Sequence, residues 1–317
     1  MAMTERVRVA VLGVVAALLF SPSVWAADPD SCQTVRFSDV GWTDITSTTA
    51  ATSVVLKALG YEPTASVLSV PVTYTSLKNG DIDVFLGNWM PTMEADIAPY
   101  RDEGSVETVA QNLTGAKYTL AVNKLAADGG ITGFGDISQY SAELEGKIYG
   151  IEPGNDGNRL IQAMIDENTF GLQGFELVES SEQGMLAQVD RANRRDQWIV
   201  FLGWEPHPMN AKYEMTYLAG GDDIFGPNFG GAEVYTNTRQ GYVEECPNVG
   251  KLLTNLTFTL AMENEIMTAI LEDEQEPQQA ATAWLQANPS ILEGWLDGVT
   301  TLSGDDGLAA VNASLGL

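Results

Sequence analysis

Two short stretches decide the fold: IDVFLGNWMP at residues 82–91 and IVFLGWEP at residues 199–206. Each begins as an apolar run typical of a buried strand, and each run is followed by Gly, Trp and Pro. In open α/β sheets, ligands bind beyond the carboxyl ends of the strands. Trp89 and Trp204 are therefore expected to face one cleft from opposite sides. The alternative is that they are two unrelated tryptophans of the core.

Further apolar runs alternate with helical patterns along the chain. They are continuous rather than alternating, which is typical of a parallel sheet covered on both faces. Strands are expected at 35–40, 65–70, 82–87, 117–122, 147–151, 175–180 and 198–203, and helices at 48–60, 74–80, 157–168 and 181–194. From Pro247 the sequence is typical of helices alone, at 249–271, at 277–289 and up to Leu317. The pattern predicts an α/β protein with mainly parallel sheets flanked by helices.

The length of 317 residues favours two lobes, because it exceeds what one hydrophobic core usually serves. The C-terminal helices have no following strands and are expected to pack on the first sheet. Lobe one then comprises residues 27–115 and 217–317, and lobe two is the inserted segment 116–216. Two crossover strands, near Ala116 and Tyr217, would form a hinge. A hinged cleft is suited to trapping a ligand.

The charge excludes several classes of function. The chain has 16 Lys and Arg against 43 Asp and Glu, a formal charge of −27. Binding to nucleic acid or to anionic lipid is not expected, since both are recognised mainly through Lys and Arg. One His and two Cys cannot form a His/Cys zinc site, and neither a metal nor another cofactor is expected. A Ser-His-Asp hydrolase would depend on that single His.

The N-terminus has the features of a secretory signal. Arg6 and Arg8 flank the start of an apolar run over 9–20, and Val24-Trp25-Ala26 provides a cleavage site. Residues 1–26 are therefore predicted to be a signal peptide, and the mature protein is expected to be soluble and periplasmic. The alternative is a buried N-terminal helix.

Export also changes the interpretation of the two cysteines. Cys32 and Cys246 can form one disulfide in an oxidising compartment, and this would place both residues in the same lobe. In the chain-entropy model, a disulfide that closes so long a loop adds roughly 5 kcal/mol to the free energy of unfolding. Two free thiols are the alternative.

Aromatic residues gather at the expected strand ends and crossings. They are Trp42, Trp89, Tyr118 and Trp204. A quaternary ammonium group suits such a set, because it has no N–H to donate and is held by the ring quadrupoles and by burial of its methyl groups. Each ring contributes roughly 0.5–2 kcal/mol. A single aromatic residue at a strand end is more often part of the core.

Polar candidates lie beside these rings. Asp44, in GWTDITSTT, is either a helix N-cap or a carboxylate that accepts a ligand hydroxyl. Asn155, in EPGNDGNRL, is either an ordinary turn residue before a helix or an amide that meets Asp44 from the other lobe. Glu205 and His207, in WEPHPMN, are expected to support the site from behind.

At these residues the sequence resembles the periplasmic substrate-binding proteins of ABC transporters for quaternary ammonium compounds, and most closely their choline-binding members. The segments that carry the resemblance extend over nearly the whole chain after residue 26: 36–50, 69–97, 115–123, 146–161, 179–189, 200–211 and 220–237. The resemblance implies a two-lobed type II periplasmic binding fold and delivery of the ligand to a membrane permease. It also implies an aromatic box of Trp42, Trp89, Tyr118 and Trp204 around the trimethylammonium group, with Asp44 and Asn155 holding the choline hydroxyl.

Simple electrostatics favours choline over glycine betaine. An ionised Asp44 accepts a hydroxyl hydrogen bond but repels the carboxylate of betaine. Betaine remains a candidate ligand because relatives specific for it present a histidine to that carboxylate, and His207 lies at a similar position. Acetylcholine and carnitine are further candidates, and a monomer is expected.

Two other functions are open from the residues alone. An exported glycoside hydrolase would need a pair of acids, for which Asp44 and Glu205 are the nearest candidates. A receptor for amino acids would need an Arg to bind the ligand carboxylate, and Arg159 is the only one near a motif. The favoured prediction is a binding protein without catalytic activity.

Overall fold

The computed structural model describes residues 28–317, so the predicted signal peptide lies outside the described residues. Its strands form one sheet in the order β2-β1-β3-β9-β4-β7-β5-β6, with β8 paired to β4. The strands are β1 (Thr34–Asp39), β2 (Glu62–Val67), β3 (Val84–Met90), β4 (Val106–Asn123), β5 (Lys147–Tyr149), β6 (Glu176–Val178), β7 (Val200–Glu205), β8 (Met215–Tyr217) and β9 (Gly231–Arg239).

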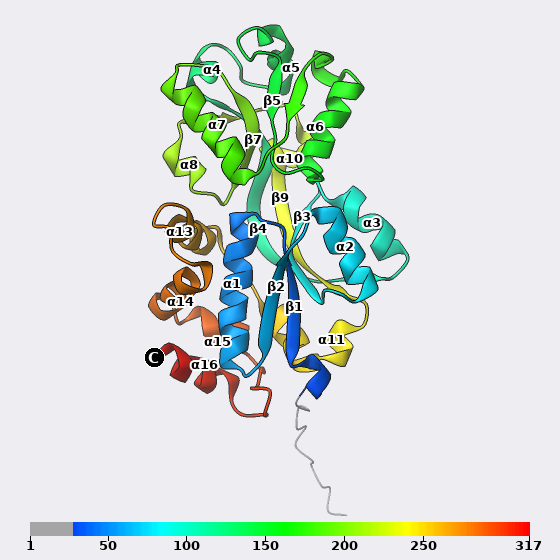
Figure 1. The fold of residues 1–317 in the computed structure, drawn as a ribbon, viewed down its shortest axis with the longest axis vertical. Coiled ribbons are helices and arrows are strands. Elements are labelled where there is room, and N and C mark those ends of the chain that lie inside the picture. Colours follow the sequence, from blue (N-terminus) through cyan, green and yellow to red (C-terminus); the bar gives the residue numbers. More distant parts are fainter. Residues whose placement is uncertain (1–27) are drawn as a thin grey trace, which may run out of the picture.

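The helices cover this sheet as two bodies, one above the other (Figure 1). The lower body contains η1 (Asp30–Cys32), α1 (Thr43–Ala58), α2 (Val70–Asn79), α3 (Glu94–Asp102), α11 (Tyr242–Glu245), α12 (Pro247–Asn255), α13 (Leu260–Leu271), α14 (Pro277–Ala287), α15 (Ile291–Trp295) and α16 (Gly307–Leu315). The upper body contains α4 (Lys124–Asp128), α5 (Phe134–Ile137), η2 (Ser138–Tyr140), α6 (Asp156–Asp166), η3 (Thr169–Gly171), α7 (Glu182–Arg194) and α8 (Met209–Lys212). Two short helices, α9 (Asp222–Phe225) and α10 (Pro227–Gly230), precede β9. The C-terminal helices pack back on the lower body, with α13 and α14 against α1 and with α12 and α13 also in contact with β4 (Figure 1).

Parallel pairing occurs within each body, and the long strand β4, which is antiparallel to its neighbours, runs through both. β1 pairs in parallel with β2 and β3, and β5 pairs in parallel with β6 and β7. The 18-residue strand β4 is antiparallel to β9 over its first part and to β7 over its last part. One strand thus carries hydrogen bonds to both bodies.

The sequence revealed neither the three-residue strand β8 nor the longer strand β9. The residues of β9, GAEVYTNTR, are mixed rather than apolar, because Thr236, Asn237 and Thr238 are buried polar residues. Such a strand lacks the continuous hydrophobic run that marks the others.

Several predicted boundaries were wrong. The strand predicted at 117–122 is the last part of the longer β4, and the helix predicted at 74–80 is α2, which begins at Val70. The first helix begins at Thr43 rather than at residue 48, because its polar start, TDITS, is buried almost throughout. The strand predicted at 65–70 is β2 at Glu62–Val67, an edge strand whose side chains are mostly exposed. The stretch 249–271 forms α12 and α13 rather than one helix, and the side chain of Thr259 caps the second of them.

After Tyr217 the chain still contacts the upper body before it crosses to the lower one. Leu218 donates its N–H to Leu120 on β4, and the Phe225 ring packs on Phe134 with centroids 5.8 Å apart. We therefore propose that the two crossings between lobes lie in β4 and at residues 226–231.

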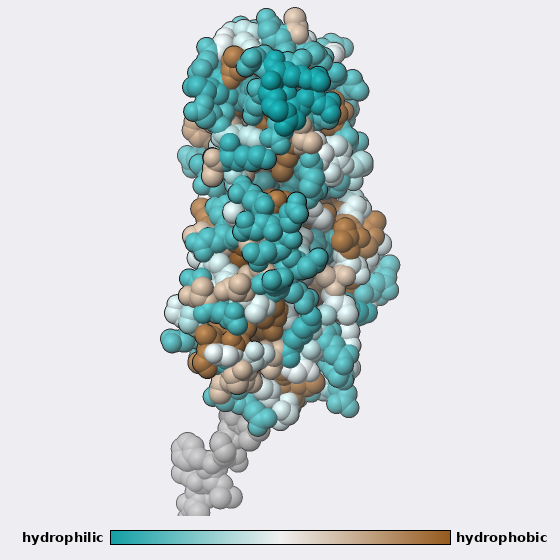
Figure 2. Space-filling model, turned by 60° about the vertical axis from the view of Figure 1, so that its left-hand side comes forward, coloured by the Kyte–Doolittle hydropathy of each residue, from teal (hydrophilic) through white to brown (hydrophobic). Residues whose placement is uncertain are grey.

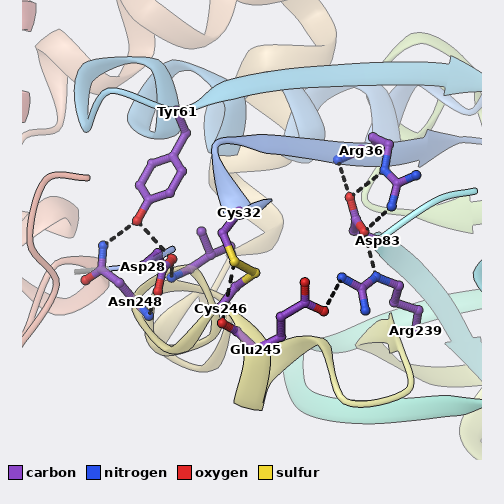
Figure 3. The surroundings of a disulfide bond; sticks show 10 residues. Asp28, Cys32, Arg36, Tyr61, Asp83, Arg239, Glu245, Cys246 and Asn248 are labelled. Atoms are coloured by element: carbon purple, nitrogen blue, oxygen red, sulfur yellow. Dashed lines mark hydrogen bonds and ion pairs between the residues drawn. A yellow bond between two sulfur atoms is a disulfide. The ribbon is translucent and has the colours of Figure 1, made fainter. Parts of the chain in front are cut away.

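The far end of the lower body is held by the disulfide between Cys32 and Cys246, whose Cα atoms lie 5.7 Å apart (Figure 3). The carboxylate of Asp28 caps α12 by accepting the N–H groups of Asn248 at 2.7 Å and Val249 at 3.0 Å. The Tyr61 hydroxyl donates to the same carboxylate. These contacts fix the start of the described chain against its C-terminal third.

Asp83 ties three segments of the same body together (Figure 3). Its buried carboxylate accepts from Arg36 on β1 at 2.6 Å and from Arg239 on β9 at 2.8 Å. Burial alone would raise the pKa of Asp83, but these hydrogen bonds outweigh it and hold the pKa below its ordinary value.

Most large apolar side chains of the described residues lie in the core, and those that are exposed are Val67, Val72, Leu125, Phe229 and Leu317. In the view of Figure 2, hydrophilic residues cover most of the upper body, and apolar residues gather mainly in small groups lower down. No helix within residues 28–317 is long and apolar enough to cross a membrane.

Removing the disulfide should destabilise the protein through the unfolded chain. We expect the double variant Cys32→Ser, Cys246→Ser to lose up to about 5 kcal/mol of unfolding free energy, because its unfolded chain is no longer constrained by the long loop. Urea unfolding followed by circular dichroism measures this loss. Reduced wild-type protein is the control and should unfold with the double variant; identical midpoints for oxidised wild type and variant would contradict the prediction.

Candidate functional site

The four predicted aromatic residues converge on one cavity between the two bodies. Trp42 precedes α1, Trp89 is near the end of β3, Tyr118 is on β4 and Trp204 is on β7, and all are buried. The cavity is small and therefore suits only a small ligand. Its lining consists of Trp42, Asp44, Trp89, Tyr118, Ile151, Asn155, Asp156 and Trp204.

Sheet register places the central rings. Tyr118 and Trp204 are directly opposed on the antiparallel strands β4 and β7, so their side chains leave the sheet on the same face. Their ring centroids lie 6.4 Å apart with planes inclined by 79°, and Tyr118 lies 6.1 Å from Trp89 at 62°. Inclined rings meet edge to face, so they enclose a space instead of stacking on one another.

Hydrogen bonds from their polar edges hold three of the rings. The Trp42 indole donates to Glu152 at 2.8 Å, the Trp89 indole donates to Asp44 at 3.1 Å, and the Tyr118 hydroxyl donates to Asn155 at 2.8 Å. These bonds restrict rotation of the rings in this closed arrangement, so the protein itself fixes the shape of the cavity.

Asp44 has one oxygen without a hydrogen-bond partner. Its Oδ2 accepts from Trp89, but its Oδ1 is buried with no partner in the structure. Burial, followed by the charge of Glu182, raises the pKa of Asp44 to about 8. The N-cap alternative for Asp44 is not what the structure shows, since Trp42 occupies the N-cap position of α1. A buried acceptor left open in a cavity is suited to a ligand donor.

Asn155 combines its two predicted roles. Its Oδ1 caps α6 by accepting the N–H of Asn158 at 3.0 Å and also accepts the Tyr118 hydroxyl. Glycine is required at position 157, in the first turn of α6, because a Cβ there would collide with the Tyr118 hydroxyl. The same Asn155 side chain thus caps α6 and forms part of the cavity wall.

Three residues around the cavity were missed by the sequence reasoning. Ile151 and Asp156 line it, and Glu152 holds Trp42. Burial raises the pKa of Asp156 to about 6 and that of Glu152 to about 7, and Asp156 Oδ2 has no partner. The only signal for them was their place beside Asn155 in IEPGND, which is weak in a chain with 43 acidic residues.

The structure places the remaining candidates outside the cavity lining. Glu205 lies 3.4 Å from Lys117 in a half-exposed ion pair. His207 is buried behind Trp204, with ring centroids 4.8 Å apart. Arg159 pairs with Asp96 at 2.6 Å, so no arginine lines this cavity to bind a carboxylate.

Comparison with known proteins agrees with the sequence resemblance. Residues 33–287 match the family described as the substrate-binding domain of ABC-type glycine betaine transport systems. A solved ABC-transporter choline-binding protein in complex with choline is 68% identical and has a TM-score of 0.90, and the match covers 91% of this chain and all of that one. The same comparison with an unliganded semi-closed form gives 68% identity, the same coverage and a TM-score of 0.84.

A curated relative of uncharacterised function from Chromohalobacter salexigens is 54% identical over 129 residues, which are 41% of this chain and 83% of the relative. Together the matches confirm the predicted family and the two-lobed α/β fold. The matched family and the two solved structures are transport binding proteins rather than enzymes, so they give no support to the hydrolase alternative.

The raised pKa of Asp44 predicts a pH-dependent effect of its removal. The ordinary pKa of an Asp is 3.8, so between about pH 4 and 8 the folded protein holds a proton that the unfolded chain has lost. The stability that Asp44 contributes is thus greatest in acid and is lost as the pH rises towards 8. Ligand-free Asp44→Asn should therefore gain thermal stability over wild type as the pH rises from about 5 to 8.

Calorimetry of both proteins across this range measures the difference. Asp81→Asn removes an exposed carboxylate and serves as the control, with a difference that stays constant. A constant difference for Asp44→Asn as well would contradict the prediction.

Proposed function

Because this chain belongs to the family of substrate-binding domains of ABC-type glycine betaine transport systems, we propose that it binds choline between its two lobes and delivers it to a membrane permease. The chain's similarity to a solved choline-binding protein supports this choice of ligand. The proposed ligand-binding residues are Trp42, Asp44, Trp89, Tyr118, Asn155 and Trp204.

The observation that carries the proposal is the unpartnered Oδ1 of Asp44 in an aromatic cavity. Choline has a hydroxyl that donates one hydrogen bond and a trimethylammonium group that donates none. The first matches the open carboxylate oxygen, and the second matches inclined ring faces. Each of the four rings attracts the cation by roughly 0.5–2 kcal/mol. Micromolar binding requires a net binding free energy of about 8 kcal/mol, so methyl burial and the hydroxyl hydrogen bond must add to the rings.

The related ligands fit less well. Glycine betaine and carnitine carry a carboxylate, which Asp44 and Asp156 would repel when they are ionised, and no cationic side chain lines the cavity to offset this. Acetylcholine has no hydroxyl to donate, so the Asp44 oxygen would remain unpaired. Glycine betaine is the second candidate, since the family is named for it.

We also place the mature protein in the periplasm as a monomer, after removal of residues 1–26. The signal-like N-terminus and the disulfide between Cys32 and Cys246 support export to an oxidising compartment. The strongly acidic composition favours encounter with a cationic ligand, more so at low salt.

Titration of tryptophan fluorescence tests the proposal. Choline should give a saturable change at micromolar concentration, and glycine betaine, carnitine and acetylcholine should need higher concentrations. Proline serves as the control ligand without a quaternary ammonium group. The proposal is wrong if millimolar choline gives no response in fluorescence or calorimetry, and glycine betaine replaces choline if it binds more tightly.

Trp204→Ala should weaken choline binding at least tenfold. It removes one ring face and its share of methyl burial, which together exceed 1.4 kcal/mol in a desolvated site. Calorimetric titration measures the change without relying on fluorescence. Trp284→Ala is the matched control, because Trp284 on α14 is tied to Glu265 away from the cavity; equal affinities for Trp204→Ala and wild type would remove Trp204 from the site.

Asp44→Asn should change the ligand preference. The amide keeps the shape of the carboxylate but cannot ionise. Above about pH 8, where Asp44 is charged, binding of choline should therefore weaken while the repulsion of glycine betaine is relieved. The ratio of the two dissociation constants is therefore expected to move towards betaine by at least tenfold. A ratio equal to that of wild type would show that the charge of Asp44 does not discriminate between the ligands.

A further inference from the structure

A second set of contacts joins the two bodies behind the cavity. The carboxylate of Glu182, at the start of α7, accepts the backbone N–H of Thr43 at 2.8 Å and the Thr43 hydroxyl at 2.6 Å. His207 Nε2 lies 3.2 Å from the same carboxylate. Thr43 is the first residue of α1 in the lower body, 139 residues away in sequence.

We propose that Thr43, Glu182 and His207 form a closure latch, in which Glu182 is a positioning residue that holds the lobes shut over the ligand. This inference rests on the proposed function, since it concerns the retention of choline in that cavity. None of the three residues lines the cavity itself.

The helix geometry explains why Glu182 is needed at this point. The first N–H groups of a helix have no partner within the helix, and a carboxylate there is favoured by the helix dipole. Trp42, the N-cap of α1, makes no capping bond with its side chain. Glu182 supplies an acceptor for the Thr43 N–H from the other body, so this group at the start of α1 is paired with Glu182 only when the bodies are together.

Burial makes the contact specific to the closed form. The side chains of Glu182 and His207 are 0% and 1% exposed, respectively. Separating α1 from α7 would return the Glu182 carboxylate to water, where it regains solvation but loses two hydrogen bonds from Thr43. The contact therefore stabilises closure without being required for either body to fold.

The latch is attached to the cavity on both sides. Thr43 lies between Trp42 and Asp44 in the sequence, so fixing its backbone fixes two cavity residues. On the upper body, His207 accepts the N–H of Met209 through Nδ1, which leaves Nε2 as the donor to Glu182. The His207 ring packs edge-on against Trp204.

The other contacts between the bodies differ in kind. Trp42 donates to Glu152 within the cavity wall, and Arg159 pairs with Asp96 in a partly exposed position. The first belongs to the ligand site, and the second is weakened by solvent. Glu182 is the buried carboxylate that accepts from both bodies outside the lining.

The test uses Glu182→Gln and Thr43→Val, which keep side-chain size while removing the charge or the hydroxyl. Choline dissociation should be about tenfold faster or more in each variant by stopped-flow fluorescence, with a much smaller change in the association rate, since the latch forms after the ligand enters. The melting temperature of the ligand-free variants should match that of wild type, while the increase produced by choline should be smaller.

Asp190→Asn is the matched control, because it removes a charge from the same helix and breaks only a pair with Lys212 inside the upper body. It should release choline at the wild-type rate. A purely structural role for Glu182 predicts instead a lower melting temperature without ligand and an unchanged dissociation rate, and either variant with this behaviour overturns the latch. If wild type itself binds neither choline nor glycine betaine, the proposed function fails first and the latch with it.

Discussion

The structure depends on a carboxylate that the protein buries without fully satisfying it. Asp44 is enclosed by aromatic rings, and one of its oxygens receives no hydrogen bond from the chain. Burial of this kind opposes folding, because water would solvate that oxygen in the unfolded chain. A site that pays this cost in the empty state gains from any ligand that brings a hydroxyl and a positive charge together. The surrounding scaffold can be understood as the means of holding that carboxylate and the rings in place.

The sheet supplies the rigid part of that scaffold. Direct opposition of Tyr118 and Trp204 on neighbouring strands fixes two walls of the cavity through backbone hydrogen bonds. The remaining walls come from the ends of other elements: Trp42 before α1, Trp89 near the end of β3 and Asn155 before α6. Side chains at element ends converge there because strand ends of both bodies meet at one edge. The strands thus determine the shape of the cavity, and the residues at the helix N-termini supply its polar groups.

Much of this could be predicted from the sequence, for identifiable reasons. The repeated strand followed by Gly, Trp and Pro marked Trp89 and Trp204, and the continuous apolar runs marked most strands. β9 escaped because its interior positions are Thr and Asn, whose burial depends on neighbours that a linear pattern does not show. Glu152, Asp156 and Glu182 escaped because acids are abundant here, and only the fold reveals which of them are buried. The family resemblance supplied the roles of Asp44 and Asn155, which their local patterns had left open.

The continuity of β4 sets how such a molecule is able to open. A strand bonded to β9 below and to β7 above cannot let the bodies slide past each other without losing register, but it can twist and flex along its length. Lys117 is the residue at which β4 changes from one partner to the other, and Tyr118 follows it directly. The phenol ring would therefore lie next to the crossing that we propose in β4, where rotation displaces atoms least. Opening at this point would move Trp42 and Trp89 relative to the Tyr118 ring, while Trp204 would stay opposite it on β7.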